Sequence, residues 1–256
     1  MKVVGFLAFA LVAFTFYQVF STPSSSRARP VAVQTYRLDT RPDSQKNFEK
    51  ITMGHHAEFT RANRNELQES TARNNRMRAL RQAGTGTAGN WVGKVDDIGT
   101  NNDGKAILTI RLNENTSVAT WNNALSDIVD GTLIPPGTPL FNSVASLRKG
   151  QTVRFSGNFF PGNELDHLRT QGLTVRDAMR DTTFLMKFTA VSVLPNNPSA
   201  TADVNLREGP STDTPSLATI PKGTSVVLLG NVDAQGWVKV GHDGKEGYVG
   251  SRNLGY

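Results

Sequence analysis

The sequence predicts a mainly β protein in which two small β-barrels follow an N-terminal hydrophobic segment and a polar helical stalk. Three observations lead to this prediction. Short apolar runs alternate with Gly, Pro, Asn and Asp turn signals through residues 90–256. A proline-free stretch rich in Glu, Gln, Arg and Ala covers residues 43–83. A long apolar run directly follows the charged start Met1-Lys2. A chain of 256 residues has room for two such modules plus non-globular segments.

Residues 1–21 have the pattern of an export signal, and two fates of this segment stay open. The run from residue 3 to 20 is interrupted only by Gly5, Thr15 and Gln18. Small residues allow cleavage after Ser21, which makes the segment a signal peptide. Without cleavage, residues 3–20 are just long enough to anchor the chain in a membrane. Either way, we expect the rest of the chain in the periplasm or cell envelope.

The positive charge of the chain belongs to its N-terminal third. Residues 1–83 carry 13 Lys and Arg against 6 Asp and Glu, giving +7, whereas residues 84–256 carry 15 against 16, giving −1. The basic linker at residues 22–42 fits either contact with anionic lipid headgroups or a solvated spacer. Because the predicted barrels are nearly neutral, nucleic acid is an unlikely partner for them.

Residues 43–83 are predicted to form the helical stalk. The apolar residues are too sparse for a coiled coil, so one helix, or two helices broken near Gly54, would fit, with Gly84 as the stop signal. Such a stalk either binds an anionic surface or partner, or is a polar spacer, and we favour the spacer. The pair His55-His56 has no third ligand nearby and does not predict a metal site.

Residues 84–89 match the sequence pattern G-x-G-x-x-G, but not the structural context in which that pattern binds a dinucleotide. The dinucleotide-binding motif needs a strand before it and a helix after it, and here that order is reversed. We therefore interpret the segment as a flexible hinge and predict no cofactor.

Residues 90–194 are predicted to form the first β module. The predicted strands cover residues 91–95, 106–112, 152–157 and 183–193, with short extended pieces at 132–134 and 139–141 and helical pieces within 121–129 and 166–181.

About five strands with an interposed helix resemble the OB-fold. Residues 147–157 are similar to the segment before and within the fourth strand of exported OB-like domains. The resemblance implies an oligonucleotide or oligosaccharide ligand. The module carries ten basic and ten acidic residues, which argues against nucleic acid. Phe159-Phe160 is the one aromatic pair that could form a stacking platform, and core packing explains it equally well.

The most specific sequence patterns lie in residues 200–256, after a linker at residues 195–199. They are Asn205-Leu-Arg-Glu-Gly-Pro-Ser211, Pro221-Lys-Gly223, Gly236-Trp-Val-Lys-Val240 and Gly247-Tyr-Val249. In this order they resemble the bacterial SH3-like domain (SH3b, type 3). The resemblance implies a small β-barrel with a non-catalytic recognition role toward cell-wall peptides, peptidoglycan or protein surfaces.

Four residues of this domain are candidate ligand contacts: Arg207, Glu208, Trp237 and Tyr248. An amphipathic aromatic side chain beside a charged loop suits a short polar peptide or sugar, although both aromatic residues could instead belong to the core. The predicted interior is Val204, Leu206, Ile220, Val226, Leu228, Val238, Val240 and Val249. The glycines expected at turns are Gly209, Gly223 and Gly247.

No set of catalytic residues is apparent in the sequence. The chain has no cysteine, which excludes a thiol nucleophile, and its four histidines are scattered. None of the motifs H-x-H, H-E-x-x-H or G-x-S-x-G occurs. We therefore predict no catalytic residues, no metal and no cofactor.

The leading hypothesis is an exported, non-catalytic binding protein. Its SH3-like domain would recognise cell-wall peptide or glycan, or an envelope protein. One alternative is a structural scaffold subunit of an envelope complex. The other is an exported OB-type binder of oligonucleotides or oligosaccharides.

Overall fold

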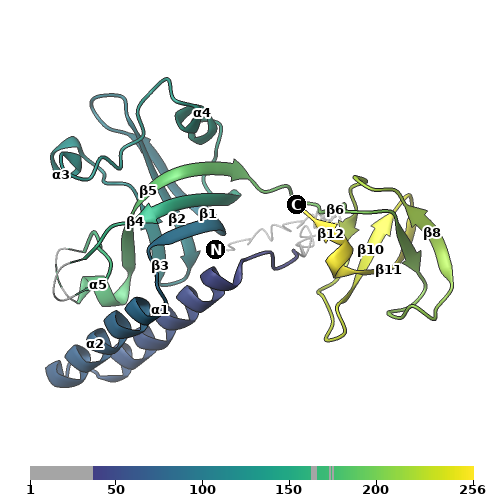
Figure 1. Cartoon of the computed structure of the whole chain (residues 1–256), viewed down its shortest axis with the longest axis horizontal. Helices are drawn as coiled ribbons and strands as arrows, with labels where there is room; N and C mark the ends of the chain where they lie inside the picture. Colours follow the sequence, from purple (N-terminus) through teal and green to yellow (C-terminus); the bar gives the residue numbers. More distant parts are fainter. Residues whose placement is uncertain (1–36, 163–165, 173, 175) are drawn as a thin grey trace, which may run out of the picture. The chain divides into compact units, whose positions relative to one another are not determined.

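The computed structural model describes residues 37–162, 166–172, 174 and 176–256, and the chain is mainly β, as predicted (Figure 1). The elements of the first part are α1 (Asp43–Arg61), α2 (Glu66–Gln82), β1 (Thr87–Thr100), β2 (Ala106–Asn113), β3 (Thr116–Ala119), α3 (Ala124–Asp127), α4 (Pro139–Ala145), β4 (Thr152–Phe159), α5 (Asp177–Arg180) and β5 (Thr182–Val193). Those of the second part are β6 (Ser199–Ala200), β7 (Val204–Arg207), β8 (Ser216–Ile220), β9 (Val227–Leu228), β10 (Trp237–His242), β11 (Lys245–Gly250), η1 (Ser251–Asn253) and β12 (Leu254–Gly255).

The expected export segment, residues 1–21, lies outside the described residues, and so does most of the basic linker. Within the part of the chain that the structure describes, no helix combines the length and the apolar character needed to cross a membrane.

The first β module is a closed barrel with the strand order β1-β2-β3-β5-β4. Strand β1 is long and pairs with β4 through its first half and with β2 through its second half. The pairing of β3 with β5 is parallel, and the other strand pairs are antiparallel. Five strands with helices between β3 and β4 agree with the predicted count, and the OB-like assignment stays an interpretation of this strand order.

Two elements of this barrel differ from the sequence prediction. The four-residue strand β3 was not predicted, and residues 139–141, expected to be extended, begin helix α4. Thr138 explains the helix, because its hydroxyl accepts a hydrogen bond from the Phe141 amide at 3.1 Å. Pro139 occupies the first helical turn, where its missing N–H costs nothing.

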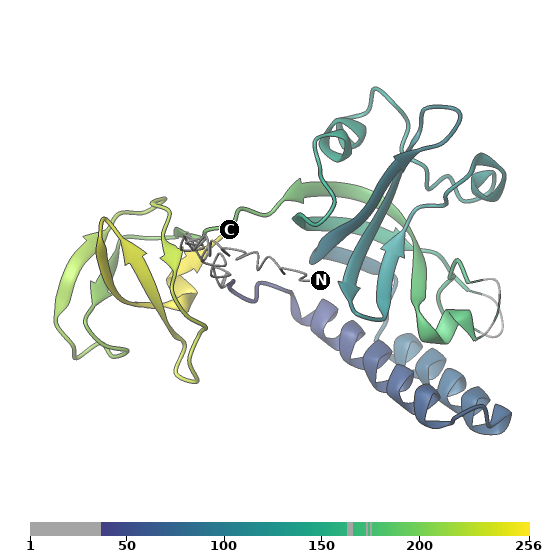
Figure 2. The same ribbon diagram turned by 180° about the vertical axis from the view of Figure 1, so that it is seen from behind.

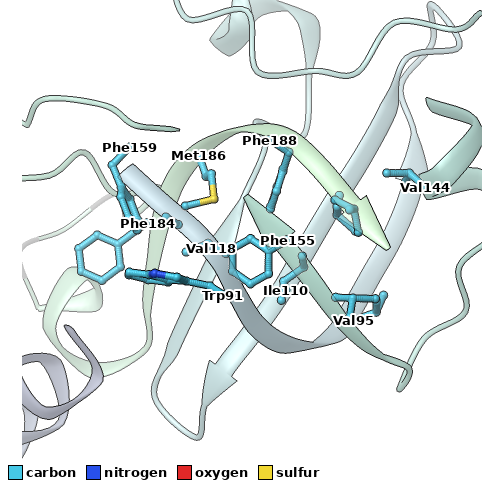
Figure 3. Close-up of a cluster of buried hydrophobic side chains, with 14 of the residues drawn as sticks. Trp91, Val95, Ile110, Val118, Val144, Phe155, Phe159, Phe184, Met186 and Phe188 are labelled. Atoms are coloured by element: carbon cyan, nitrogen blue, oxygen red, sulfur yellow. The ribbon is translucent and has the colours of Figure 1, made fainter. Parts of the chain in front are cut away.

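The barrel core is built around aromatic rings, several of which Figure 3 shows. Phe48, Trp91, Phe155, Phe159, Phe184 and Phe188 are all buried, and neighbouring ring centroids lie 5.0–6.4 Å apart. Five of these rings come from the strands, but Phe48 comes from α1. Helix α1 therefore supplies part of the barrel core.

Residues 43–83 are helical, as predicted, but they are packed on the barrel and are not a free spacer. Residues 43–83 form two helices that lie side by side against one end of the barrel (Figures 1 and 2). The chain reverses at Asn63 and Arg64, both with positive φ, and not at Gly54, which is inside α1. Phe48 and Leu80 are 1% and 2% exposed and belong to the barrel core, so each helix contributes a large apolar side chain to the docking.

Buried polar groups complete the docking of α1. The Gln45 side chain donates to the Val92 carbonyl and accepts from the Val92 amide at 2.7 Å. It therefore pairs with the backbone of β1 in the way that the backbone of an adjacent strand would. Gln45 also donates to Glu49, whose other carboxylate oxygen receives the Arg41 guanidinium at 2.7 Å. Burial raises the pKa of Glu49, so these partners are needed to keep it charged.

The expected hinge at residues 84–89 is also part of the barrel domain. Gly84, with φ of +64°, ends α2 as predicted, and the amide of Thr85 bonds back to the Leu80 carbonyl. Residues 87–89 already belong to β1, where Ala88 is buried. Helix, stop signal and strand thus follow one another without a free linker.

The second β module contains a five-stranded sheet of order β8-β7-β11-β10-β9 and a two-stranded sheet of β12 and β6. The predicted interior is confirmed: Leu206, Ile220, Val226, Leu228, Val238, Val240 and Val249 are buried, and Val204 packs half-buried against them. Strands β10 and β11 are joined by Asp243 and Gly244, both with positive φ, as a type I′ hairpin turn requires.

The three glycines expected at turns divide into two kinds. Gly223 has φ of +83° in the turn after β8, and Gly209 lies in the loop after β7. Gly247 is instead buried within β11, so the turn assignment was wrong for it. A Cβ atom there would stand 2.5 Å from the Arg207 carbonyl oxygen, so glycine is what lets β11 approach β7.

Replacing Phe48 tests whether α1 is part of the barrel core. We expect Phe48→Ala to lower the free energy of unfolding by about 3–5 kcal/mol, because it opens a cavity among the core aromatic rings. The half-exposed Met53 on the same helix is the control, and Met53→Ala should change stability by less than about 0.5 kcal/mol. Denaturant titration followed by near-ultraviolet circular dichroism measures both. Similar small losses for the two variants would contradict the assignment.

Replacing Gly247 tests the close approach of β11 and β7. Gly247→Ala should destabilise the C-terminal domain by about 1–3 kcal/mol, since the added methyl group meets backbone. Gly241→Ala, on the adjacent strand β10, should be tolerated, because its methyl group would lie 3.5 Å from the Leu229 side chain, an ordinary contact. Denaturation midpoints of the two variants give the comparison, and equal midpoints would be the contrary result.

Candidate ligand-binding site of the C-terminal domain

The outer face of the five-stranded sheet brings together three of the four predicted contact residues. Along β10 and β11, the valines point into the core and the alternate residues point outward. Tyr248 pairs with Lys239 on one side and with Arg207 on the other. Trp237 pairs with Gly250, which has no side chain to cover the indole. Arg207, Trp237 and Tyr248 are half-buried, so none of them belongs to the core.

A pocket of about 590 Å³ lies beside this face. Four short segments line it: the start of β7, the β7–β8 loop, the turn into β10 and the turn η1. The lining residues are Asp203, Val204, Asn205, Arg207, Pro210, Ser211, Thr212, Gln235, Gly236, Trp237, Gly250, Ser251, Arg252 and Asn253. Arg207 and Trp237 are therefore pocket residues, whereas Tyr248 lies next to the pocket and Glu208 is exposed outside it.

The β7–β8 loop is braced by Thr214. Its hydroxyl oxygen lies 3.0 Å from the Gly209 carbonyl and 2.8 Å from the Ser211 carbonyl, and it accepts from the Gly209 amide. The Arg207 guanidinium donates to the Thr214 carbonyl at 2.6 Å. Arg207 thus holds one wall of the pocket in place, and one of its guanidinium nitrogens is already used in this hydrogen bond.

The opposite wall is braced by Asp233. Its carboxylate accepts from the amides of Gln235 at 3.0 Å and Trp237 at 2.8 Å, and its own amide donates to the Trp237 carbonyl. The Ser251 amide donates to the carbonyl of Gly236, which connects this turn to η1. The backbone that presents the indole is therefore fixed before any ligand arrives, which lowers the entropic cost of binding.

The free cation of the pocket is Arg252, which the sequence analysis missed. It is exposed on η1 and makes no ion pair within the described residues. The lining also contains an anion, the Asp203 carboxylate, which accepts a hydrogen bond from the Lys222 amide at 2.8 Å and is not paired with Arg252. A short 3₁₀ turn after a strand has no periodic sequence pattern, so Arg252 and the neighbouring Asn253 gave no signal in advance.

The chemistry of the pocket suits recognition of a polar chain. It offers one aromatic surface, three hydroxyl groups, three carboxamides and a free guanidinium. The lining also holds the Asp203 carboxylate, and its described residues include no histidine, lysine or glutamate. Across the described residues as a whole, no cluster of three or more histidines and carboxylates is arranged to hold a metal ion.

The other aromatic candidate, the pair Phe159-Phe160, does not form an exposed platform. Phe159 is 7% exposed and stacks on Phe48 at 5.4 Å between ring centroids. Phe160 is half-buried. For Phe159, core packing was the right explanation.

Comparison with known proteins supports the identity of the C-terminal domain. Residues 202–255 match the model of the family described as bacterial SH3 domain, which confirms the resemblance stated from the sequence. A search of curated protein sequences gave no significant match.

Among solved structures, the chain is similar to those titled "Structure of NlpC2 from Trichomonas vaginalis" and "Structure of NlpC1 from Trichomonas vaginalis". Each has 15% identity and a TM-score of 0.23. The matches cover 43% of this chain and 37% or 35% of those chains, so they span little more than a third of the similar proteins. The likeness is too low to carry an argument about fold or activity.

Proposed function

We propose that this protein is a non-catalytic recognition protein of the bacterial cell envelope. Its SH3-like domain binds a short polar peptide of the cell wall in the pocket beside Trp237. The observation that carries this proposal is the position of Trp237 at the pocket wall, half-buried, opposite Gly250 and between two braced loops. A tryptophan whose indole has one solvent-exposed face is a common binding contact for peptides and sugars.

The polar lining favours a peptide over an apolar ligand. Amide groups of a peptide backbone can pair with the carboxamides of Asn205, Gln235 and Asn253. A carboxylate of the ligand can pair with the free guanidinium of Arg252. Cell-wall peptides supply both groups, and bacterial SH3 domains commonly bind cell-wall material, which agrees with the family match at residues 202–255.

The location of the protein is part of the proposal. The apolar run at residues 3–20 has the pattern of an export signal or anchor, and the chain has no cysteine that would need a reducing compartment. Export places the domain where cell-wall peptides are accessible. In this proposal the domain recognises these peptides without cleaving them.

Sedimentation of the full-length protein with purified peptidoglycan tests the proposal. We expect Trp237→Ala to weaken binding at least about tenfold, because the main aromatic contact is lost. Trp237→Phe should keep part of the affinity. The control is Val227→Ala, which shortens a half-exposed side chain outside the pocket and should bind like the wild type.

Two results would count against this function. One is the absence of peptidoglycan binding by a correctly folded wild-type protein. The other is unchanged binding by Trp237→Ala, which would move the contact away from this pocket. Binding to an isolated envelope protein, without binding to peptidoglycan, would favour the scaffold hypothesis.

A further inference from the structure

The barrel domain has a pocket of its own, separate from the one beside Trp237. It has a volume of about 360 Å³, within the range of small-molecule sites. It lies where the link from α2 to β1 meets the end of β4 and the chain after it. Its lining residues are Arg81, Thr85, Gly86, Phe159, Pro161, Gly162, Asp166, His167 and Leu168.

The floor of this barrel pocket is apolar and rigid. The ring of Phe159 lies 5.4 Å from Phe48, 5.6 Å from Trp91 and 6.2 Å from Phe184, measured between centroids. Figure 3 shows Phe159 at one end of the aromatic core, beside Phe184. Leu168 is 3% exposed and completes the floor. Because these side chains are packed from behind, the floor cannot readily move into the pocket.

Backbone hydrogen bonds join the described segments that line the barrel pocket. The Phe159 amide donates to the Gly86 carbonyl at 3.0 Å, which joins the α2–β1 link to β4. The Gly162 amide donates to the His167 carbonyl at 3.0 Å, and Pro161 pairs with Leu168 in a short bridge. The space next to Gly86 is open, since a Cβ atom there would meet no heavy atom within 4 Å.

The charges around the barrel pocket leave one cation without a partner. Asp166 is paired with the buried guanidinium of Arg76 at 3.2 Å. Arg76 also donates to the Ala178 carbonyl, so this ion pair serves the docking of α2. Arg81, one turn further along α2, is exposed and makes no hydrogen bond or ion pair within the described residues. Among the described residues that line the pocket, Arg81 is therefore the cation available to a ligand.

We propose that the barrel pocket binds a small amphipathic carboxylate, with an aromatic or branched aliphatic body on Phe159 and Leu168 and its anionic group on Arg81. An apolar floor with a few convergent polar groups is the usual composition of a small-molecule site. The guanidinium of Arg81 recognises a carboxylate by paired hydrogen bonds, and the Thr85 hydroxyl lies in the same lining. A free acid and the C-terminal residue of a peptide share this chemistry.

Isothermal titration calorimetry of the full-length protein tests this site with two probes, N-acetyl-L-phenylalanine and its uncharged amide. We expect saturable binding of the acid, about tenfold tighter than that of the amide. Arg81→Gln should remove the preference for the acid. The matched control is Arg78→Gln, which removes the same charge from the same helix, outside the pocket, where Arg78 bonds only to Asn75. It should keep the preference.

A third variant separates this site from the one that the proposed function uses. Trp237→Ala should leave binding of N-acetyl-L-phenylalanine unchanged. Loss of binding in Trp237→Ala, with no effect of Arg81→Gln, would assign the probe to the C-terminal pocket and overturn the inference. Equal affinity for acid and amide, or no saturable binding at millimolar probe, would overturn it as well.

Discussion

The C-terminal site depends on the alternation of inward-facing and outward-facing residues along β10 and β11, the two strands of the closing hairpin. Asp243 and Gly244 form the turn that sets the register of β10 against β11. In this register Val238, Val240 and Val249 fill the core. A slip of one residue would bury Trp237 and expose the valines, at the cost of the whole interior. The core of the domain thus dictates that the indole stays outside.

The two domains use their aromatic residues in different ways. The barrel domain buries six aromatic rings, among them Trp91, which is 1% exposed. The SH3-like domain fills its core with aliphatic side chains and leaves Trp237 and Tyr248 at its surface. A core of Val, Leu and Ile is sufficient for so small a domain, so its aromatic side chains are available for a ligand. This contrast, more than the presence of tryptophan itself, supports a recognition role.

The sequence predicted best those features that depend on local periodicity. Alternating apolar residues gave the core of the SH3-like domain correctly. Glu208, also predicted as a contact, is exposed outside the pocket; it follows the last residue of β7, where the alternation no longer fixes its direction. Arg252 was missed because it lies in a short turn. Gly247 was taken for a turn residue, since a sequence does not reveal how closely two strands approach.

Long-range packing was the harder part to predict. Residues 43–83 are polar on average, which suggested a free spacer, yet the side chain of Phe48 joins α1 to an aromatic core that is distant in sequence. Gln45 adds hydrogen bonds to the backbone of Val92, a kind of contact that no composition reveals. The helix pair also contributes Arg81 to the lining of the barrel pocket.

Nuclear magnetic resonance tests most directly whether the C-terminal pocket recognises a cell-wall peptide. The measurement is a titration of the ¹⁵N-labelled full-length protein with a soluble peptidoglycan stem peptide. We predict saturable shifts of the Trp237 indole and backbone signals and of the amides of Ser211, Ser251 and Arg252. Shifts confined to residues outside this pocket, or no saturable shifts in a folded protein, would contradict the account.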